Sequence, residues 1–493
     1  MARVPLGRYS IIDACKDPAL FGPWFKDPAS WAGWFAFLKH LFGLRLSPSD
    51  MRIVSARTGR LPAQNHRYNE AWLIVGRRGG KSMIVALVAV YLAFFYNWKP
   101  YLSPGELGTI IIVAADRQQA RVILRYIKGF VENIPFFRSE KTRDTATALE
   151  FRRRRIAIEV HTTSFRATRG YTIVAALLDE VAFWRSDETA NPDEEVLNAI
   201  RPGMATIPGA MLLAASSPYS KRGILFNMHR DYFGKDSDDV LVWHGDTRSM
   251  NPRISQKYLD RQYDKDAARA SAEYGAQFRA DIEDFITEEI VDANVDAGVF
   301  ERPYSPSHMH RAFCDPSGGS QDSFTWAIGH PEDGARWVDL LREVTAPFDP
   351  DEAVAECAAD LKRYGILKVE GDNYAGNWPK AKFQKYGITY EPCGMRKSDI
   401  YRDALPILNS KGSRLIENRR LRTQILCLER KNGKGGKFSI DHPKGGKDDC
   451  ANAVLGLIAR MEARKVEFSD EHIIVADELS SFATDSLPQL GAM

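Results

Sequence analysis

The chain has 493 residues, a length that predicts two or three domains. With 44% hydrophobic and 27% charged residues it has the composition of an ordinary globular protein, which excludes collagen-like, fibrous and disordered chains. The formal net charge is only +3, so charge alone does not predict a nucleic-acid partner, and any basic surface must be local.

Cysteine spacing and apolar runs narrow the class further. The six cysteines form no CxxC pair, which indicates a reduced intracellular protein without a cysteine-based zinc or disulfide framework. The longest uninterrupted apolar run, residues 83–96, is too short to span a bilayer, and no signal-peptide pattern opens the chain. We therefore expect a soluble protein with no membrane partner.

The first half of the chain predicts an α/β fold. Residues 1–65 are expected to form a helical preface, to which the sequence assigns no role. From 66 to 280, short apolar runs alternate with helical segments, which is typical of a parallel sheet covered by helices on both faces. Strands are predicted at 71–75, 109–115, 173–178 and 210–216, and helices after Lys81 and at 117–133.

The second half follows a different order. Residues 281–305 are acidic and contain proline, and they are predicted to be a linker. From 306 to 465, three strand-like runs precede alternating helices and strands, the order of an RNase H-like fold. Residues 466–493 contain no lysine or arginine and carry a charge of −6, which predicts a flexible acidic tail.

A phosphate-binding loop is predicted where the strand at 71–75 meets the next helix. The segment reads Gly76-Arg77-Arg78-Gly79-Gly80-Lys81-Ser82. The backbone of the glycines and Arg78 would surround the phosphates, Lys81 would supply a positive charge, and the Ser82 hydroxyl would ligate Mg²⁺. Val75 stands where the strict motif has glycine, so a simple glycine-rich turn remains the alternative.

Two acids at the end of the strand at 173–178 are the predicted partners of this loop. Asp179 would hold Mg²⁺ and its water shell, and Glu180 would polarise the attacking water. The next strand ends at Ser216 and Ser217, whose hydroxyls could report hydrolysis, although a Ser-Pro turn explains them equally well.

Four acids at the ends of predicted elements in the second half indicate a nuclease. Asp315 and Asp372 each end a strand, and Asp448 and Asp449 open the last helix. Oxygen ligands without His or Cys suit Mg²⁺ or Mn²⁺, and two such ions ~3.5–4 Å apart activate water and stabilise the leaving 3′ oxygen of a phosphodiester. Each acid could instead be a cap or turn residue, and Asp448 is placed to be an N-cap.

Basic residues are expected at both sites. The arginines that stabilise charge during phosphoryl transfer would be Arg77 from the same subunit and Arg169 from a neighbouring one. Between 430 and 447, glycines alternate with basic residues, and such a loop could follow a phosphate backbone without reading bases. A solvated hairpin is the alternative. The predicted DNA contacts are Lys434, Lys437, Lys444 and Lys447.

In this order the motifs resemble the large terminase subunit of tailed double-stranded DNA bacteriophages, the ATP-driven motor and nuclease that packages genomes into procapsids. The resemblance covers residues 65–465 and rests on GRRGGKS, RATRG, IVAALLDE, AASSP, CDPSGGSQD, EGDNYAG and GGKDDCANAV. It implies a P-loop NTPase (RecA-like) domain at 66–280 and an RNase H-like nuclease at 306–465. It also implies ATP and Mg²⁺ as cofactors, with Mn²⁺ as an alternative ion at the nuclease site.

The same resemblance implies roles for single residues. Glu180 would be the hydrolytic base, and Arg169 would complete a neighbouring subunit's site. The nuclease metals would be held by Asp315, Asp372 and Asp449, with Asp448 as an additional ligand. The adenine-contacting glutamine motif of the family is not clear here, and Gln64 is the one candidate offered by the residues before the loop.

Partners and location also follow from the resemblance. They are double-stranded DNA, the portal protein of the procapsid, the small terminase subunit and a homo-oligomeric ring expected to be a pentamer. The protein would work in the host cytoplasm, dock transiently on the portal and be absent from the mature virion. From the residues alone, a helicase-nuclease and a nucleotide-gated docking protein without nuclease activity remain alternatives.

Overall fold

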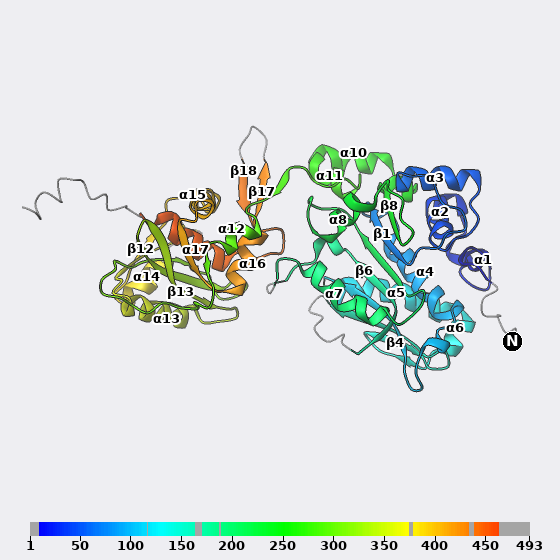
Figure 1. Cartoon of the computed structure of the whole chain (residues 1–493), viewed down its shortest axis with the longest axis horizontal. Helices are drawn as coiled ribbons and strands as arrows, with labels where there is room; N and C mark the ends of the chain where they lie inside the picture. Colours follow the sequence, from blue (N-terminus) through cyan, green and yellow to red (C-terminus); the bar gives the residue numbers. More distant parts are fainter. Residues whose placement is uncertain are drawn as a thin grey trace, which may run out of the picture. The chain divides into compact units, whose positions relative to one another are not determined.

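The computed structural model describes residues 9–115, 117–162, 170–186, 189–373, 378–432 and 438–462. These residues divide into two units between Glu283 and Asp284, and Lys431 and Asn432 group with the first unit. Each unit is built around its own large sheet (Figure 1). Among the described residues, no helix is both long and apolar enough to cross a membrane.

The first unit contains an eight-stranded sheet. In spatial order its strands are β3 (Arg143–Asp144), β4 (Ala148–Phe151), β5 (Ile156–Thr162), β2 (Gly108–Ala114), β6 (Thr172–Asp179), β7 (Met211–Ser216), β1 (Glu70–Val75) and β8 (Val240–Gly245). Six neighbouring strands are parallel: β5, β2, β6, β7, β1 and β8. The strands β4 and β3 extend one edge as antiparallel strands. One strand, β7, separates β1 from β6. This is the predicted P-loop NTPase sheet of RecA type.

Alternate side chains of these strands enter two separate cores. On β1, Leu73 and Val75 pack with the helices of one face, and Trp72 and Ile74 pack with those of the other. The first face is covered by α1 (Ile11–Lys16), α2 (Ala32–Leu41), α3 (Pro48–Thr58), α4 (Lys81–Phe95), α5 (Arg117–Asn133) and α6 (Pro135–Glu140). The second face is covered by α7 (Pro192–Met204) and α8 (Gly223–Tyr232). A strand buried on both faces is apolar throughout, which is why the sequence located these strands closely.

The rest of the first unit consists of short elements. After β8 follow α9 (Thr247–Met250), α10 (Gln256–Lys265) and α11 (Ala267–Glu273). Short 3₁₀ helices lie at Gly22–Trp24, Pro28–Trp31, Lys99–Tyr101 and Val181–Phe183. The expected preface is therefore helical, and it packs on the face of the sheet that carries α4.

The second unit contains a seven-stranded sheet. In spatial order its strands are β10 (Val295–Asp296), β16 (Ser413–Ile416), β13 (Ala335–Val344), β12 (Phe324–Glu332), β11 (Arg311–Asp315), β14 (Lys368–Gly371) and β15 (Thr389–Pro392). The strands β11, β12 and β13 form an antiparallel meander. On the other side of β11, β14 and β15 continue the sheet as parallel strands. This order is that of the predicted RNase H-like fold.

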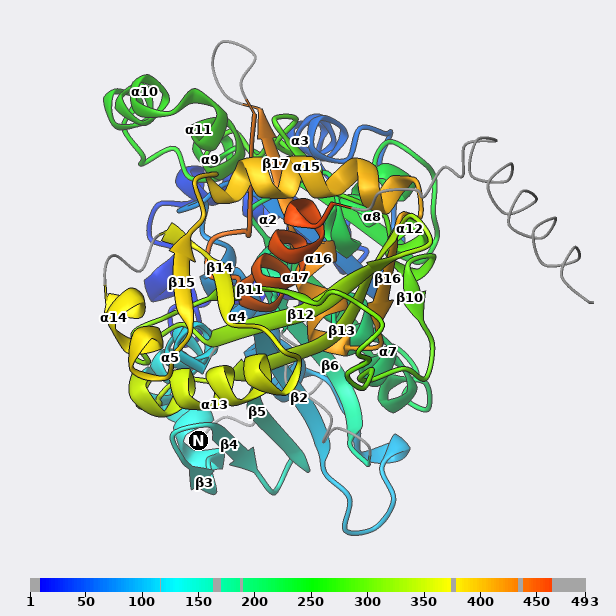
Figure 2. The ribbon, with the colours of Figure 1, turned by 90° about the vertical axis from the view of Figure 1, so that its left-hand side faces the viewer.

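Helices cover both faces of this sheet as well. Phe313 of β11 packs with one set of helices, and its neighbours Ala312 and Cys314 pack with the other. The first set is α12 (Glu288–Asp292), α15 (Lys397–Asn409), α16 (Arg419–Cys427) and α17 (Asp449–Arg460). The second is α13 (Pro350–Arg363) and α14 (Trp378–Lys385). Figure 2 shows α17 lying across β11 and β12 next to α15.

The segment predicted as a linker differs from expectation. Residues 281–305 contain α12 and the strands β9 (Ile282–Asp284) and β10. The strand β10 pairs with β16 and forms one edge of the second sheet. The strands escaped notice because they are two and three residues long, too short to show an alternating pattern. A third, small sheet has the order β18 (Phe438–Asp441), β17 (Glu429–Asn432), β9. The predicted acidic tail, 466–493, lies outside the described residues.

Candidate functional site

The loop between β1 and α4 has the backbone geometry of a phosphate cradle. Gly80 precedes α4 with φ +100°, and Arg78 has φ +66°, a left-handed conformation that is uncommon outside glycine. A Cβ on Gly76 would lie 2.4 Å from Thr247 Oγ1 and 2.6 Å from the Tyr274 carbonyl oxygen, so only glycine fits there. The first N–H groups of α4 have no acceptor within the helix, which leaves them available to an anion.

The side chain of Lys81 reaches from α4 to the ends of two strands. Its ammonium donates to the Val75 carbonyl (2.8 Å) and to Ser217 Oγ (2.9 Å), and it lies 3.5 Å from Glu180 Oε1. Only 6% of the side chain is exposed. A buried ammonium needs acceptors and a counter-ion, and here the last residue of β1, the serine after β7 and the acid after β6 supply them. Ser82 follows, half-buried in the first turn.

Asp179 and Glu180 stand at the end of β6, as the sequence predicted. Burial first, and then the neighbouring Glu180 carboxylate, raise the pKa of Asp179 to about 7. Its Oδ1 is buried and has no hydrogen-bond partner among the described residues. An orphaned carboxylate oxygen next to a phosphate loop fits the predicted role of Asp179 in holding a hydrated Mg²⁺.

The carboxylate of Glu180 is held in place from β7. Its Oε2 accepts hydrogen bonds from Ser217 N (3.1 Å) and Ser216 Oγ (3.2 Å). Its backbone has φ +50°, which is a strained conformation for this residue type. The serines at the end of β7 therefore contact both the predicted base and Lys81, which is more than a Ser-Pro turn requires.

The structure describes only one of the two candidate arginines. Arg77 is exposed, and its guanidinium pairs with Glu273 of α11 at 3.2 Å, so in this conformation it engages an acid of α11. Arg169 lies outside the described residues. The other basic side chain of the loop, Arg78, is also exposed, and its carbonyl accepts a hydrogen bond from Asn251 Nδ2 at 2.9 Å.

The second unit brings two of its four predicted acids together where β11 and β14 end, on a residue that the sequence analysis did not single out. Asn452 Nδ2, on α17, donates to Asp315 Oδ2 (2.9 Å) and to Asp372 Oδ2 (3.0 Å). Burial raises the pKa of Asp315 well above its ordinary range, the Asn452 hydrogen bond opposes this, and the charges of Asp372 and Asp449 raise it further. One amide thus holds two mutually repelling carboxylates together.

Asp448 and Asp449 have separate surroundings. Asp448 occupies the N-cap position of α17, but it makes no side-chain cap bond; instead it accepts from Lys397 Nζ and Tyr401 Oη, each at 2.7 Å. Asp449, in the first turn, accepts one bond from Ser323 N at 3.3 Å, and burial raises its pKa. Asp449 is therefore the better placed of the two to join Asp315 and Asp372 as a metal ligand, with Asp448 bound by other partners.

The residues missed in this site are Asn452 and Lys397. Asn452 lies three residues after Asp449 on the same helix, a spacing that places both on one face, so the periodicity carried a signal for it. Lys397 is on α15, remote in sequence, and nothing local marked it. The carboxylates fit Mg²⁺ or Mn²⁺, since they are hard oxygen ligands. Burial first, and then the charges of neighbouring carboxylates, raise the pKa values of Asp315 and Asp449, and a bound cation would relieve this concentration of negative charge.

The predicted DNA-contacting lysines are described only in part. Lys434 and Lys437 lie outside the described residues. Lys444 is exposed, and the half-buried Lys447 donates to the Gln321 carbonyl at 2.9 Å. Lys447 immediately precedes the acids of α17. Burial raises the pKa of Asp449, and the positive charge of Lys447 offsets a part of that rise.

Comparisons with known proteins found a matching family model and similar solved structures. Residues 49–276 match the family model described as the N-terminal P-loop domain of the uncharacterized protein MJ0330. The chain is similar to bacteriophage large terminases. The HK97 large terminase structure is 15% identical over 84% of this chain and 95% of its own, with a TM-score of 0.37. The large terminase of a thermophilic bacteriophage, in complex with ADP, is 13% identical over 88% and 99%, with a TM-score of 0.38.

A nuclease structure is also similar to part of the chain. The large terminase nuclease from thermophilic phage G20c with bound magnesium is 15% identical over 35% of this chain and 96% of its own, with a TM-score of 0.31. The comparison with curated proteins gave no match. Similarities this distant assign no activity, so the function has to be argued from the residues of the two sites.

Proposed function

We propose that this protein is a large terminase: an ATP-driven motor that translocates double-stranded viral DNA into a procapsid, with a metal-dependent endonuclease that cuts concatemeric DNA. The observation that carries the proposal is the combination of two sites in one chain. One unit holds the buried Lys81 beside Glu180 at a phosphate loop, and the other holds Asp315 and Asp372 on the amide of Asn452. The order of the sequence motifs supports the same assignment.

At the first site, the protein residues would bind and orient Mg·ATP. Lys81 would exchange its contacts with the Val75 carbonyl and Ser217 for phosphate oxygens, while Ser82 and Asp179 would hold the ion. Bound Mg²⁺ would supply neutralisation of charge on the phosphates. Glu180 would accept a proton from the attacking water. Because Ser216 and Ser217 donate hydrogen bonds to this carboxylate, a movement of β7 would shift the position of the Glu180 carboxylate.

At the second site, Asp315, Asp372 and Asp449 would hold Mg²⁺ or Mn²⁺, which would activate a water and stabilise the leaving 3′ oxygen of DNA. The raised pKa values of Asp315 and Asp449 imply that cation binding displaces protons, so we expect tighter metal binding at higher pH. Asn452 would change partners or turn when ions enter. Lys397 would hold the Asp448 carboxylate in place beside them.

The partners are proposals of the same kind. Double-stranded DNA, a portal protein, a small terminase subunit and a homo-oligomeric ring follow from the terminase assignment, as does transient docking on the procapsid in the host cytoplasm. Lys444 and Lys447, next to the acids, would contact the DNA backbone, and Lys434 and Lys437 would extend that contact.

The decisive experiment measures ATP hydrolysis by the full chain with and without DNA, and with and without procapsids that carry their portal. A terminase should be stimulated most when DNA and portal-bearing procapsids are both present, and the DNA should become resistant to added nuclease as it enters the capsid. Equal ATPase rates with and without portal would contradict the packaging assignment. Strand separation on a forked substrate would point instead to a helicase-nuclease, and intact plasmid after incubation with Mn²⁺ would point to a docking protein.

A further inference from the structure

A cluster of histidines lies in the second unit, apart from the acids of the predicted nuclease site. His308 and His310 precede β11, His330 and Glu332 lie at the end of β12, and Asp339 is on β13. Because β11 runs from Arg311 to Asp315, the cluster and the acidic site are at opposite ends of this strand. No motif of the sequence analysis and no step of the proposed function uses these residues.

A hydrogen bond within the cluster orients the ring of His330 and leaves its second nitrogen available as a metal ligand. His330 Nδ1 lies 2.7 Å from Asp339 Oδ2, and Asp339 is fully buried, so the ring donates from Nδ1 to this carboxylate. In the neutral ring, the other nitrogen, Nε2, then carries a lone pair. A carboxylate behind a histidine is the arrangement that orients metal-binding imidazoles in proteins.

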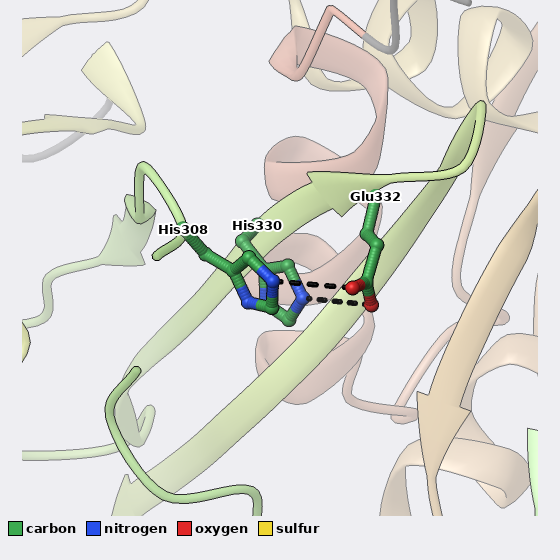
Figure 3. Close-up of side chains that lie close together, drawn as sticks. All are labelled: His308, His330 and Glu332. Atoms are coloured by element: carbon green, nitrogen blue, oxygen red, sulfur yellow. Dashed lines mark ion pairs between the residues drawn. The ribbon is translucent and has the colours of Figure 1, made fainter. Parts of the chain in front are cut away.

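Three candidate ligands converge in front of that lone pair. His330 Nε2 lies 3.6 Å from Glu332 Oε2, and His308 Nε2 lies 3.1 Å from Glu332 Oε1. Figure 3 shows the rings of His308 and His330 stacked side by side, with a nitrogen of each facing the Glu332 carboxylate; the ring centroids are 4.1 Å apart at an interplanar angle of 12°. The three ligand atoms lie within 4.8 Å of one another.

A second observation points to a missing partner at the same place. His330 is 95% buried, and its Nε2 has no hydrogen-bond partner among the described residues, although it faces Glu332 and His308. A buried ring nitrogen that carries a lone pair and accepts no hydrogen bond is costly unless something binds it. Glu332 and His308 are partly exposed, so an ion at this point would be reachable from solvent.

We propose that His308 Nε2, His330 Nε2 and Glu332 bind a zinc-class divalent cation, with Asp339 as the positioning residue of His330. Two imidazoles and one carboxylate suit Zn²⁺ and similar transition-metal ions, whereas the all-oxygen site at Asp315 suits Mg²⁺ or Mn²⁺. Water from the exposed side would complete a four-coordinate shell. The ion would fasten the segment before β11 to the β12–β13 hairpin.

The test uses the full chain, stripped of metal with a chelator and titrated with Zn²⁺ in excess Mg²⁺, which keeps the acidic site occupied. Wild type should bind one Zn²⁺ at this site by calorimetry, and bound Co²⁺ should give the visible absorption of a four- or five-coordinate ion. His308→Ala and Glu332→Gln, at partly exposed positions, should remove this binding event, and Asp339→Asn should weaken it by about 10–100-fold. His442→Ala is the matched control, because His442 also lies beside two carboxylates, Asp441 and Asp448.

Loss of Zn²⁺ binding in the first two variants with retention in His442→Ala supports the site. Wild type that binds no Zn²⁺ in excess Mg²⁺ overturns it. Retention of the same stoichiometry and affinity in both His308→Ala and Glu332→Gln also overturns it, as does loss in His442→Ala alone, which would place the zinc beside Asp448. None of these readouts depends on ATPase or nuclease activity.

Discussion

Glu180 combines an unfavourable backbone with a well-held side chain. A left-handed φ of +50° is strained for glutamate. With this backbone the carboxylate lies at the end of β7, where it accepts hydrogen bonds from Ser216 Oγ and Ser217 N. Its other oxygen lies near Lys81. Strain retained at a residue that touches the predicted phosphate site is consistent with a catalytic role.

Replacement of Glu180 should separate binding from turnover. Glu180→Ala removes the proposed base and leaves the loop, so we expect kcat for ATP to fall by about 10²–10⁴-fold while ATP still binds. Steady-state hydrolysis and the Kd of a fluorescent ATP analogue report the two quantities. Lys81→Ala, the comparison variant, should lose both. An unchanged kcat in Glu180→Ala would remove Glu180 from the mechanism.

At the second site, the carboxylates should not be interchangeable. Asp315→Asn should reduce Mn²⁺-dependent plasmid cleavage by more than about 100-fold, because it removes an anionic ligand, and should leave ATP hydrolysis unchanged. Glu370→Gln is the matched control: Glu370 lies on the adjacent strand β14 but pairs with Arg460 at 2.9 Å. Equal cleavage by Asp315→Asn and wild type would contradict the nuclease assignment.

At the scale of elements, α2 gives the helical preface a role that the sequence did not reveal. Trp34 Nε1, from α2, donates to the Gly79 carbonyl of the phosphate loop at 2.8 Å. The same indole nitrogen would lie 3.0 Å from a Cβ at Gly80. The preface therefore packs against the sheet and also holds the loop in its curled form.

The loop contact predicts an effect on nucleotide affinity. Trp34→Phe removes a buried hydrogen bond worth ~1 kcal/mol, so the Kd for ATP should rise roughly fivefold as the loop loosens. Trp31→Phe makes the same chemical change immediately before α2, where the indole nitrogen has no hydrogen-bond partner among the described residues. The same Kd in both variants would show that the hydrogen bond does not shape the loop.

At the scale of the whole molecule, a buried histidine should contribute to the loss of stability in acid. Burial, followed by the charges of Arg60 and His66, lowers the pKa of His40 from 6.5 to about 4. Between pH 6.5 and about pH 4, His40 is protonated in the unfolded chain but not in the folded chain. The free energy of unfolding therefore falls as the pH drops below 6.5. The loss from this one residue is about 2 kcal/mol at pH 5.

His40→Leu should abolish this contribution. Neither ring nitrogen of His40 has a hydrogen-bond partner among the described residues, so leucine forfeits no bond. We expect the difference in unfolding free energy between pH 7 and pH 5 to shrink by about 2 kcal/mol in the variant. Denaturation followed by tryptophan fluorescence at the two pH values measures it, and an equal pH dependence in both proteins would refute the assignment.

If the protein assembles into the proposed ring, mixed rings give a test of Arg169, which lies outside the described residues. If Arg169 acts on a neighbour, Arg169→Ala and Glu180→Ala subunits are each inactive alone but complement each other at shared interfaces. An equal random mixture should regain at most about a quarter of wild-type hydrolysis, since each active site needs both intact residues. No recovery in mixed rings would exclude action between subunits.

Sequence pattern located much of the fold because the strands are buried on both faces and the loop glycines are locally required. The strands at 71–75 and 109–115 were placed within one residue of β1 and β2, and the loop at Gly76 to Ser82 lies between strand and helix as expected. The short strands β9 and β10 were missed, since two or three residues have no measurable period.

The sequence by itself determined the two folds, their order and the acids at their strand ends, because apolar periodicity and turn chemistry are local properties. Only the tertiary structure decided which side chains meet. Trp34 contacts Gly79, and Asn452 joins Asp315 to Asp372. His308, before β11, lies next to Glu332 at the end of β12. Long-range packing sets these contacts, and no local pattern encodes them.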